Sequence, residues 1–382
     1  MGTGRRDLRV AFIDQTGDVS GGAQESFALL LQHLPKWIVP HVVFFHDGRY
    51  ADRLRGAGFQ VTVLPVSDAL SASKREHASI AGLLSAPAAI VRLARWLRAH
   101  RIDVAYTHTV KAHFIGAPAA RLAGTRCVVH LRDILEGPPL LALRKICAAC
   151  SRERIAISQS VARAYALPAT TVVFNPLDLG TYDVLPSRAQ ACAALGIPFA
   201  PDVPTIGIVG RINRWKGHDK FVRIAANVRS RVEARFLIIG DAVFRDADFV
   251  DELRATVRDA GLQDACTFVP WVDDVRNAYA ALDVHGNCSE REPFGRSVIE
   301  AAACGVPTVC FADAGVSEVL SDKIDARVVA PGDEAAFADA IVDVVRSPQK
   351  RAMADAARRL ARRFDADAHA AEVAWILTRA AA

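Results

Sequence analysis

Short runs of apolar and β-branched residues alternate with longer amphipathic stretches along both halves of this 382-residue chain. In the longer stretches apolar positions recur at the spacing of a helix face, whereas the short runs are typical of buried strands. A repeated strand-then-helix order predicts parallel strands with helices on both faces of the sheet. In the first half the predicted strands are 8–13, 41–45, 61–64, 104–107 and 127–131, and the helices between them include 24–33, 80–98 and 111–122.

The same alternation begins again with a buried strand at 205–209. Between the two halves, the polar, proline-bearing stretch 178–204 has the composition of an interdomain connection. We therefore predict an α/β protein with an N-terminal Rossmann-like domain at 1–178 and a C-terminal one at 202–364. In such sheets ligands collect at the carboxyl ends of the strands.

One helix opening in the second half carries two carboxylates, Glu292 and Glu300. Pro293 suits the first position of that helix and Gly305 suits its end. Two solvated glutamates on an amphipathic helix are the alternative interpretation.

The amide groups of Phe294 and Gly295, followed by Arg296, lie where the positive end of the helix dipole is expected. Free amides at a helix start form an anion site. An anion between two carboxylates suits a ligand built as sugar, diphosphate and ribose.

Two cations, Arg211 and Lys216, flank the loop that follows the strand at 205–209. Arginine offers a forked pair of donors and lysine a point charge, so the two together can bind a diphosphate. A solvated pair of cations is the alternative.

Polar residues also follow the strands of the first half. His130 and Arg132 come at the end of one strand and Lys111 comes after its neighbour, although a lone histidine is more often structural. The loop 14–23 contains Gly21 and Gly22 but lacks the dinucleotide and P-loop glycine motifs. It suits a phosphate or sugar that approaches the backbone closely, or an ordinary glycine turn.

Eight scattered cysteines include one C-x-x-C pair, Cys147 and Cys150, with no second pair to complete a zinc site. We expect reduced, buried thiols and neither a metal nor a cofactor. Since no export signal precedes the first predicted strand, a cytoplasmic address is expected.

Charge is divided unevenly between the halves. Residues 1–178 carry 22 Lys+Arg and 13 Asp+Glu, and residues 179–382 carry 25 and 29. The basic half predicts an anionic partner: a lipid surface at the inner face of the membrane, a lipid-linked acceptor or an acidic saccharide. Arginines that merely solvate helix faces are the alternative. The arginines at 351–363 are interpreted as a solvated face, so no nucleic acid is expected.

The run from Glu292 through Glu300 to Gly305 resembles the E-x7-E signature of retaining glycosyltransferase family 4. The segment 210–217 is similar to that family's Gly-Arg…Lys-Gly diphosphate clamp, and residues 21–24 resemble its N-terminal glycine loop. The resemblance implies a GT-B fold, in which two Rossmann-like domains face each other across a cleft. It also implies that a last helix at about 365–382 packs back on the N-terminal domain, with 375–377 as its apolar anchor.

Roles for individual residues follow from the same resemblance. Glu292 and His130 would contact the transferring sugar, Glu300 would bind the ribose, and Trp271 would border the base. The implied catalytic residues are Glu292, His130, Arg211 and Lys216. The implied donor-binding residues are Gly21, Gly22, Arg211, Lys216, Trp271, Phe294, Gly295, Arg296 and Glu300. The candidates for binding the acceptor are Lys111 and Arg132.

The chain departs from the family pattern at three positions. Arg132 stands where many relatives carry histidine, Pro270 stands where glycine is usual, and Gly315 is a single glycine where two adjacent ones are usual.

The function implied is transfer of a sugar from a nucleotide-diphosphate sugar, with UDP or GDP as the expected nucleotide, to an acceptor hydroxyl with retention of configuration. Synthesis of bacterial cell-surface polysaccharide or glycolipid is the expected setting, and the acceptor is a saccharide, a lipid-linked molecule or another hydroxyl compound. A nucleotide-sugar 2-epimerase on the same fold and a non-catalytic sugar-nucleotide scaffold are the alternatives.

Overall fold

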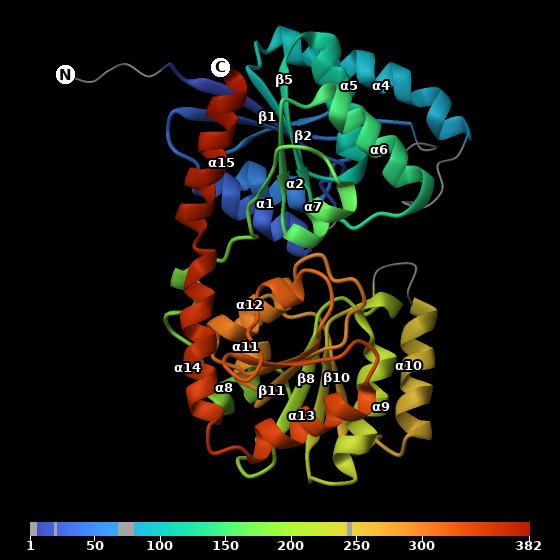
Figure 1. Ribbon diagram of the computed structural model, residues 1–382, viewed down its shortest axis with the longest axis vertical. Coiled ribbons are helices and arrows are strands. Elements are labelled where there is room, and N and C mark those ends of the chain that lie inside the picture. Colours follow the sequence, from blue (N-terminus) through green and yellow to red (C-terminus); the bar gives the residue numbers. More distant parts are fainter. Residues whose placement is uncertain (1–5, 19–20, 68–79, 243–246) are drawn as a thin grey trace, which may run out of the picture. The chain divides into compact units, whose positions relative to one another are not determined.

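The computed structural model describes residues 6–18, 21–67, 80–242 and 247–382. It divides into two compact units (Figure 1). The first unit combines Met1–Pro176 with Ala366–Ala382, and the second is Leu177–Asp365. The chain therefore returns to its first unit at its end.

The first unit is built on a seven-stranded sheet with the order β3-β2-β1-β4-β5-β6-β7. Every pairing in it is parallel, and β1 lies between β2 and β4. The strand order therefore reverses between β1 and β4, the place where an α/β sheet of this kind forms its binding crevice. The strands are β1 Leu8–Asp14, β2 Ile38–Phe44, β3 Gln60–Val63, β4 Val104–Thr107, β5 Arg126–Leu131, β6 Glu153–Ala156 and β7 Thr170–Val172.

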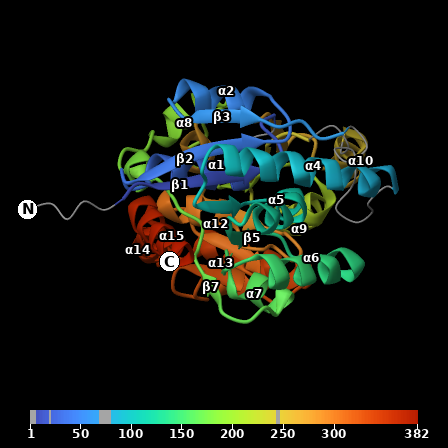
Figure 2. The ribbon, with the colours of Figure 1, turned by 90° about the horizontal axis from the view of Figure 1, so that it is seen from above.

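Helices cover both faces of this sheet (Figures 1 and 2). α4, α5 and α6 lie side by side on one face, and α1 lies with the C-terminal helix α15 on the other. Right-handed crossovers on either side of the reversal produce this division. The helices are α1 Gly22–Gln32, α2 Arg49–Gly56, α4 Ile80–Ala99, α5 Val110–Ala123, α6 Gly137–Cys150, α7 Gln159–Tyr165 and α15 Ala366–Ala381.

The second unit has a six-stranded parallel sheet with the order β10-β9-β8-β11-β12-β13. Its order reverses between β8 and β11, so the loops after these two strands meet at one edge. The strands are β8 Thr205–Val209, β9 Arg235–Ile239, β10 Cys266–Val269, β11 Val284–Asn287, β12 Thr308–Phe311 and β13 Ala326–Val329. The α-helices are α8 Arg188–Ala194, α9 His218–Arg229, α10 Ala247–Asp259, α11 Val275–Ala280, α12 Arg296–Ala303, α13 Glu334–Arg346 and α14 Lys350–Ala361. The 3-10 turns are Leu179–Tyr182, Arg214–Lys216, Val316–Glu318 and Arg362–Phe364.

The predicted class is confirmed: both sheets are parallel and Rossmann-like. Each has its own apolar core, because strands covered on both faces are buried along their whole length. The first core includes side chains from α15, although that helix lies more than 190 residues beyond most of the sheet.

Candidate active site

The loop after β8 places Lys216 at the reversal of the second sheet. Asn213 caps the 3-10 turn there, since its side chain accepts a hydrogen bond from the Lys216 amide at 3.1 Å. Gly217 follows with φ of +72°, and a Cβ at that position would lie 2.2 Å from the Cys288 carbonyl oxygen. Glycine is therefore required for the chain to turn into α9 so close to the strand next to β8.

Lys216 reaches the E-x7-E segment directly. Its Nζ lies 2.5 Å from Oε2 of Glu292, and the two side chains are only 18% and 8% exposed. Two residues that were predicted separately, from different loops, thus form a largely buried ion pair. Burial makes such a pair sensitive to the loss of either partner, because the remaining charge would be left uncompensated.

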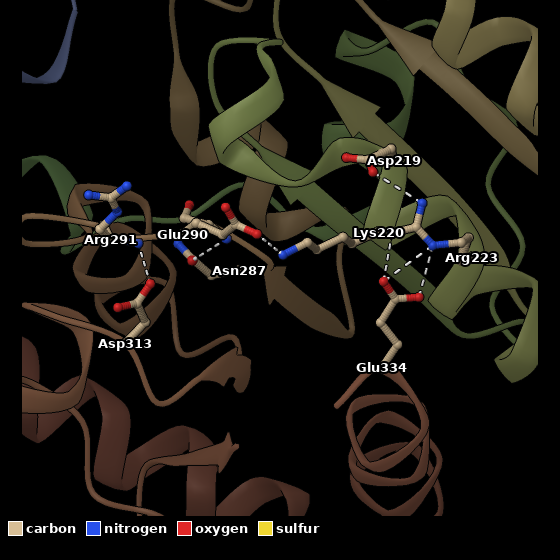
Figure 3. Close-up of polar contacts among 9 residues, drawn as sticks. Asp219, Lys220, Arg223, Asn287, Glu290, Arg291, Asp313 and Glu334 are labelled. Atoms are coloured by element: carbon tan, nitrogen blue, oxygen red, sulfur yellow. Dashed lines mark hydrogen bonds and ion pairs between the residues drawn. The ribbon is translucent and has the colours of Figure 1, made fainter. Parts of the chain in front are cut away.

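The segment that carries Glu292 is fastened at several points (Figure 3). Glu290 accepts a hydrogen bond from Lys220 of α9, and its amide donates to the Trp215 carbonyl at 2.8 Å. Asp313 accepts from the amide of Arg291, a non-glycine residue with φ of +50°. These bonds fix a loop whose backbone is in a conformation that side chains seldom adopt.

The helix that supplies Lys220 is itself tied to α13 (Figure 3). Arg223 of α9 lies 2.6 Å from Glu334 at the start of α13 and 3.1 Å from Asp219 on its own helix. Lys220 thus projects from an element with a fixed position in the second unit.

The predicted start of the E-x7-E helix is wrong. α12 begins at Arg296, with Gly295 as its N-cap in a left-handed conformation at φ of +90°. A helix that began at Pro293 would need right-handed dihedral angles at Gly295, so Pro293 and Phe294 remain outside it. The first-turn amides of the helix therefore belong to Arg296 and Ser297 rather than to Phe294 and Gly295.

The end of that helix agrees with the prediction. Gly305 has φ of +69°, its amide donates to the Ala302 carbonyl, and the amide of Val306 donates to that of Ala301. This is the usual way a glycine ends a helix.

Glu300 lies within α12 and is 13% exposed. Its Oε1 accepts from Nε of Arg296 at 2.7 Å, and its Oε2 accepts from the Tyr279 hydroxyl at 3.1 Å. The carboxylate is thereby held in one orientation, and Arg296 takes part in the site through this ion pair.

Arg211 and Trp271 lie at the ends of two other strands of this sheet. Arg211 follows β8 and is half-buried, whereas Trp271 follows β10 and is 53% exposed. The Trp271 amide donates to Asp241 at 3.1 Å, but its indole covers no core. Trp271 is therefore not a buried anchor of its loop.

In the first unit, His130 is fully buried at the end of β5. Its Nδ1 is bonded to the Tyr106 hydroxyl, and its Nε2 has no hydrogen-bond partner among the described residues. Burial, together with the charge of Arg132, lowers the pKa of His130 well below its usual value. The ring is neutral and keeps one polar atom for a ligand.

Sequence reasoning assigned no role to the residues around His130. His108 and His369 lie beside it, with ring centroids 6.1 and 6.4 Å away, and burial lowers the pKa of His369 to about 3. His369 belongs to α15, and no local pattern marks it.

Asp14, at the end of β1, is also buried. Burial raises its pKa to about 6, against the lowering effects of a hydrogen bond from Thr109 at 2.9 Å and of the Arg132 charge. Its position at the end of a central strand was the one available signal.

The structure separates the two candidates for the acceptor. Arg132 is only 7% exposed and donates to the Asn175 side chain. Lys111, in the first turn of α5, lines a cavity of about 410 Å³ at the ends of β1 and β2. The other lining residues are Gln15, Thr16, Asp18, Phe45, His46, Asp47, Val66 and Ile115.

Gly21 and Gly22 mark the start of α1. Gly21 is its N-cap, in extended conformation, and accepts a hydrogen bond from the Glu25 amide at 2.9 Å. Residues 19–20 of the same loop lie outside the described part of the chain.

Within the described residues, no group of three or more His, Cys, Asp or Glu side chains is arranged to hold a metal ion. None of the helices in the described ranges combines the length and apolarity that crossing a membrane requires.

Two family models match this arrangement of units. Residues 21–176 match the glycosyl transferase 4-like domain, and residues 197–360 match glycosyl transferases group 1. The chain belongs to glycosyltransferase family 4. The expectation of a retaining glycosyltransferase of this family, with a nucleotide-sugar donor, is confirmed.

Curated relatives carry the name D-inositol 3-phosphate glycosyltransferase. This glycosyltransferase is 31% identical to the one from Xylanimonas cellulosilytica over 308 residues, 75% of this chain and 69% of that protein. It is also 31% identical to the one from Kineococcus radiotolerans over 237 residues, 59% of this chain but only 53% of that protein.

Solved structures show the same fold over nearly the whole chain. HepE from Anabaena, crystallised with UDP and glucose, is 25% identical with a TM-score of 0.84, over 97% of this chain and 99% of that one. Sucrose-phosphate synthase from Thermosynechococcus elongatus is 18% identical with a TM-score of 0.78, over 97% and 98%. The GT-B fold is thereby confirmed.

Proposed function

We propose that this glycosyltransferase takes a hexose from UDP-glucose, or from a UDP-sugar close to it, and transfers it with retention to a hydroxyl of a saccharide or lipid-linked acceptor. HepE, which shares 25% of its residues over 97% of this chain, has been crystallised with UDP-glucose. The setting we propose is synthesis of cell-surface polysaccharide or glycolipid.

The observation that carries the proposal is the ion pair between Lys216 and Glu292, 2.5 Å apart at the reversal of the second sheet. A bound diphosphate would take donors from Lys216, from Arg211 and from the first-turn amides of α12. Negative charge grows on the leaving diphosphate during transfer, and donors that already contact it before the bond breaks stabilise that charge more than the ground state. Lys216 would turn from Glu292 to the phosphate oxygens, and the freed carboxylate would accept a hydrogen bond from a hydroxyl of the sugar.

Glu300 has a different part in the proposal. Tyr279 and Arg296 hold its carboxylate, at 3.1 and 2.7 Å, as a preset acceptor for two ribose hydroxyls. A group that binds the unreactive end of the donor contributes equally to the ground state and the transition state. Its loss should therefore weaken donor binding more than it slows transfer.

We expect UDP-glucose to raise the melting temperature more than GDP-glucose or ADP-glucose does, because a ligand that binds only the folded state stabilises it.

Replacing Lys216 by alanine should weaken UDP binding roughly 10- to 100-fold, the value of one hydrogen bond to a charged group. The measurement is titration calorimetry with UDP. Arg359→Ala, on the exposed side of α14, is the matched control for the loss of one positive charge. Equal UDP affinity in the two variants would show that Lys216 does not bind the diphosphate.

The same assay separates the alternatives. Glu292→Gln should lose transfer and keep most of its UDP affinity, whereas Glu300→Gln should lose affinity first. Conversion of the UDP-sugar to an epimer without any acceptor would identify an epimerase. Tight UDP binding without turnover on any acceptor would favour a scaffold.

A further inference from the structure

One face of the first sheet is covered by helices without a single acidic residue. These are α4, α5 and α6, of 20, 14 and 14 residues. Together they contain seven Lys+Arg and no Asp or Glu. At the whole chain's ratio of 42 acidic residues in 382, helices of this combined length would carry about five, so random placement does not account for the composition.

The opposite face of the same sheet carries balanced charge. α1, α2 and α15 share one apolar core there, and together they carry four acidic residues and four cations. The acidic residues are Glu25, Asp52, Asp367 and Glu372, and the cations are Arg49, Arg53, Arg55 and Arg379. An arginine-rich composition that only solvates helix faces would affect both sides alike. The difference between the faces therefore points to a partner on the α4–α6 side (Figure 2).

Exposed aliphatic side chains lie among the cations of the α4–α6 face. Val91 on α4, Leu122 on α5 and Leu141 on α6 are 38%, 46% and 55% exposed. Arg92 and Arg95 on α4 and Lys145 on α6 are exposed beside them, and no described residue pairs with these three charges. Each helix of the layer thus presents an exposed aliphatic side chain, and α4 and α6 also present exposed cations.

We propose that the α4–α6 face docks the protein on an anionic phospholipid surface. Each Lys or Arg near such a surface contributes about 1 kcal/mol, and the aliphatic side chains gain further by entering the boundary between headgroups and acyl chains. Nucleic acid suits this face less well, because unpaired bases need exposed aromatic rings for stacking. Trp96 of α4 is instead stacked on His100, with ring centroids 4.1 Å apart. This docking does not rest on the proposed donor or acceptor.

The test is flotation of the full-length protein with vesicles of phosphatidylcholine alone or mixed with phosphatidylglycerol. The variant carries Arg92→Glu, Arg95→Glu and Lys145→Glu. The control carries Arg351→Glu, Arg359→Glu and Arg362→Glu, three exposed arginines of the second unit. Both triple variants change the net charge of +5 by the same amount, so a difference between them reports position alone.

The wild type and the control should bind the anionic vesicles, and the α4–α6 variant should bind at least about 100-fold more weakly. Binding of the wild type should also fall between 0.1 and 1 M salt, where the Debye length shrinks from about 10 to about 3 Å. Leu141→Ser, a milder change at an exposed position, should weaken binding without altering the melting temperature.

Three results would overturn the proposal. One is equal binding by the two triple variants, and another is equal binding of the wild type to neutral and anionic vesicles. The third is competition by duplex DNA that displaces the wild type from anionic vesicles and binds it more tightly, which would assign the face to nucleic acid.

Discussion

Among the described residues, the imidazole of His130 has a single hydrogen-bond partner, the Tyr106 hydroxyl. Burial raises the pKa of Tyr106 and lowers that of His130, so a neutral hydroxyl meets a neutral ring. Nδ1 is the acceptor that the described residues offer to the hydroxyl hydrogen, so we expect the ring proton to lie on Nε2. Nε2 is the atom without a partner among the described residues, and it can donate to a sugar oxygen. Tyr106 is thus a positioning residue that acts through His130.

We expect Tyr106→Phe to release this tautomer, because Nδ1 would lose its donor. Nitrogen-15 spectra of the His130 ring should show a protonated Nε2 in the wild type and a mixture in the variant. Sugar transfer should slow roughly 10-fold, the effect of about one hydrogen bond. Tyr50→Phe is the matched control, since Tyr50 is equally buried in the same unit and donates to the Gln24 carbonyl at 2.9 Å. A ring protonated on Nδ1 in the wild type, or identical behaviour of the two variants, would contradict the assignment.

Among the elements, the turn after β12 shows why this chain keeps one glycine where relatives usually have two. Ala314 takes the first position with φ of +40°, a conformation that costs a non-glycine residue about 1 kcal/mol. Gly315 takes the second with an ordinary φ of −69°, but a Cβ there would lie 2.1 Å from the Pro293 carbonyl oxygen. Strain at the first position is tolerable, whereas overlap with backbone at the second is not.

Gly315→Ala should therefore destabilise the protein by roughly 1–3 kcal/mol, the usual cost of forcing extra volume into a packed place. It should also weaken UDP binding, because the Gly315 amide holds the Glu292 carbonyl at 2.9 Å. Urea unfolding and calorimetry measure the two effects. Gly56→Ala, at a glycine of α2 with no atom within 4 Å of the added methyl, should cost no stability and should leave UDP binding unchanged. If Gly315→Ala had wild-type stability, the turn would be able to shift and make room for the added methyl group.

In the whole molecule, the last helix completes the core of the first unit. Ile376 and Leu377 are fully buried against side chains of α1 and of the sheet, whereas Trp375 is 57% exposed. The apolar anchor predicted at 375–377 thus consists of its last two residues. The first unit is incomplete without a segment that the chain reaches only after it has formed the second.

Leu377→Ala should lower the free energy of unfolding of the first unit by about 2–5 kcal/mol, through lost burial and the cavity left behind. Hydrogen exchange read by mass spectrometry should show faster exchange in β4 and β5, with little change in β8 and β9. Trp375→Ala, two residues away on the exposed side, serves as the control. An equal rise in the exchange rates of both sheets would mean that the two units unfold together.

Local pattern was sufficient for much of the architecture. β4 and β8 span the predicted 104–107 and 205–209, and the other predicted strands differ by a few residues because strand ends depend on pairing partners. The residue types of the site were also readable from motifs. The start of α12 was not, because Pro293 is as suitable a first residue as Arg296 until the left-handed Gly295 excludes it.

The amino-acid sequence by itself determined the two parallel sheets, the edges at which polar residues gather, and the family, since hydrophobic period and motif spacing are local properties. Only the tertiary structure decided which charges meet. It paired Lys216 with Glu292, turned Arg132 inward to Asn175, placed His369 against His130 and gathered three acid-free helices on one face. Each of these depends on contacts between segments far apart in the chain, and the strand order and crossover direction that bring such segments together are set by packing of the whole unit.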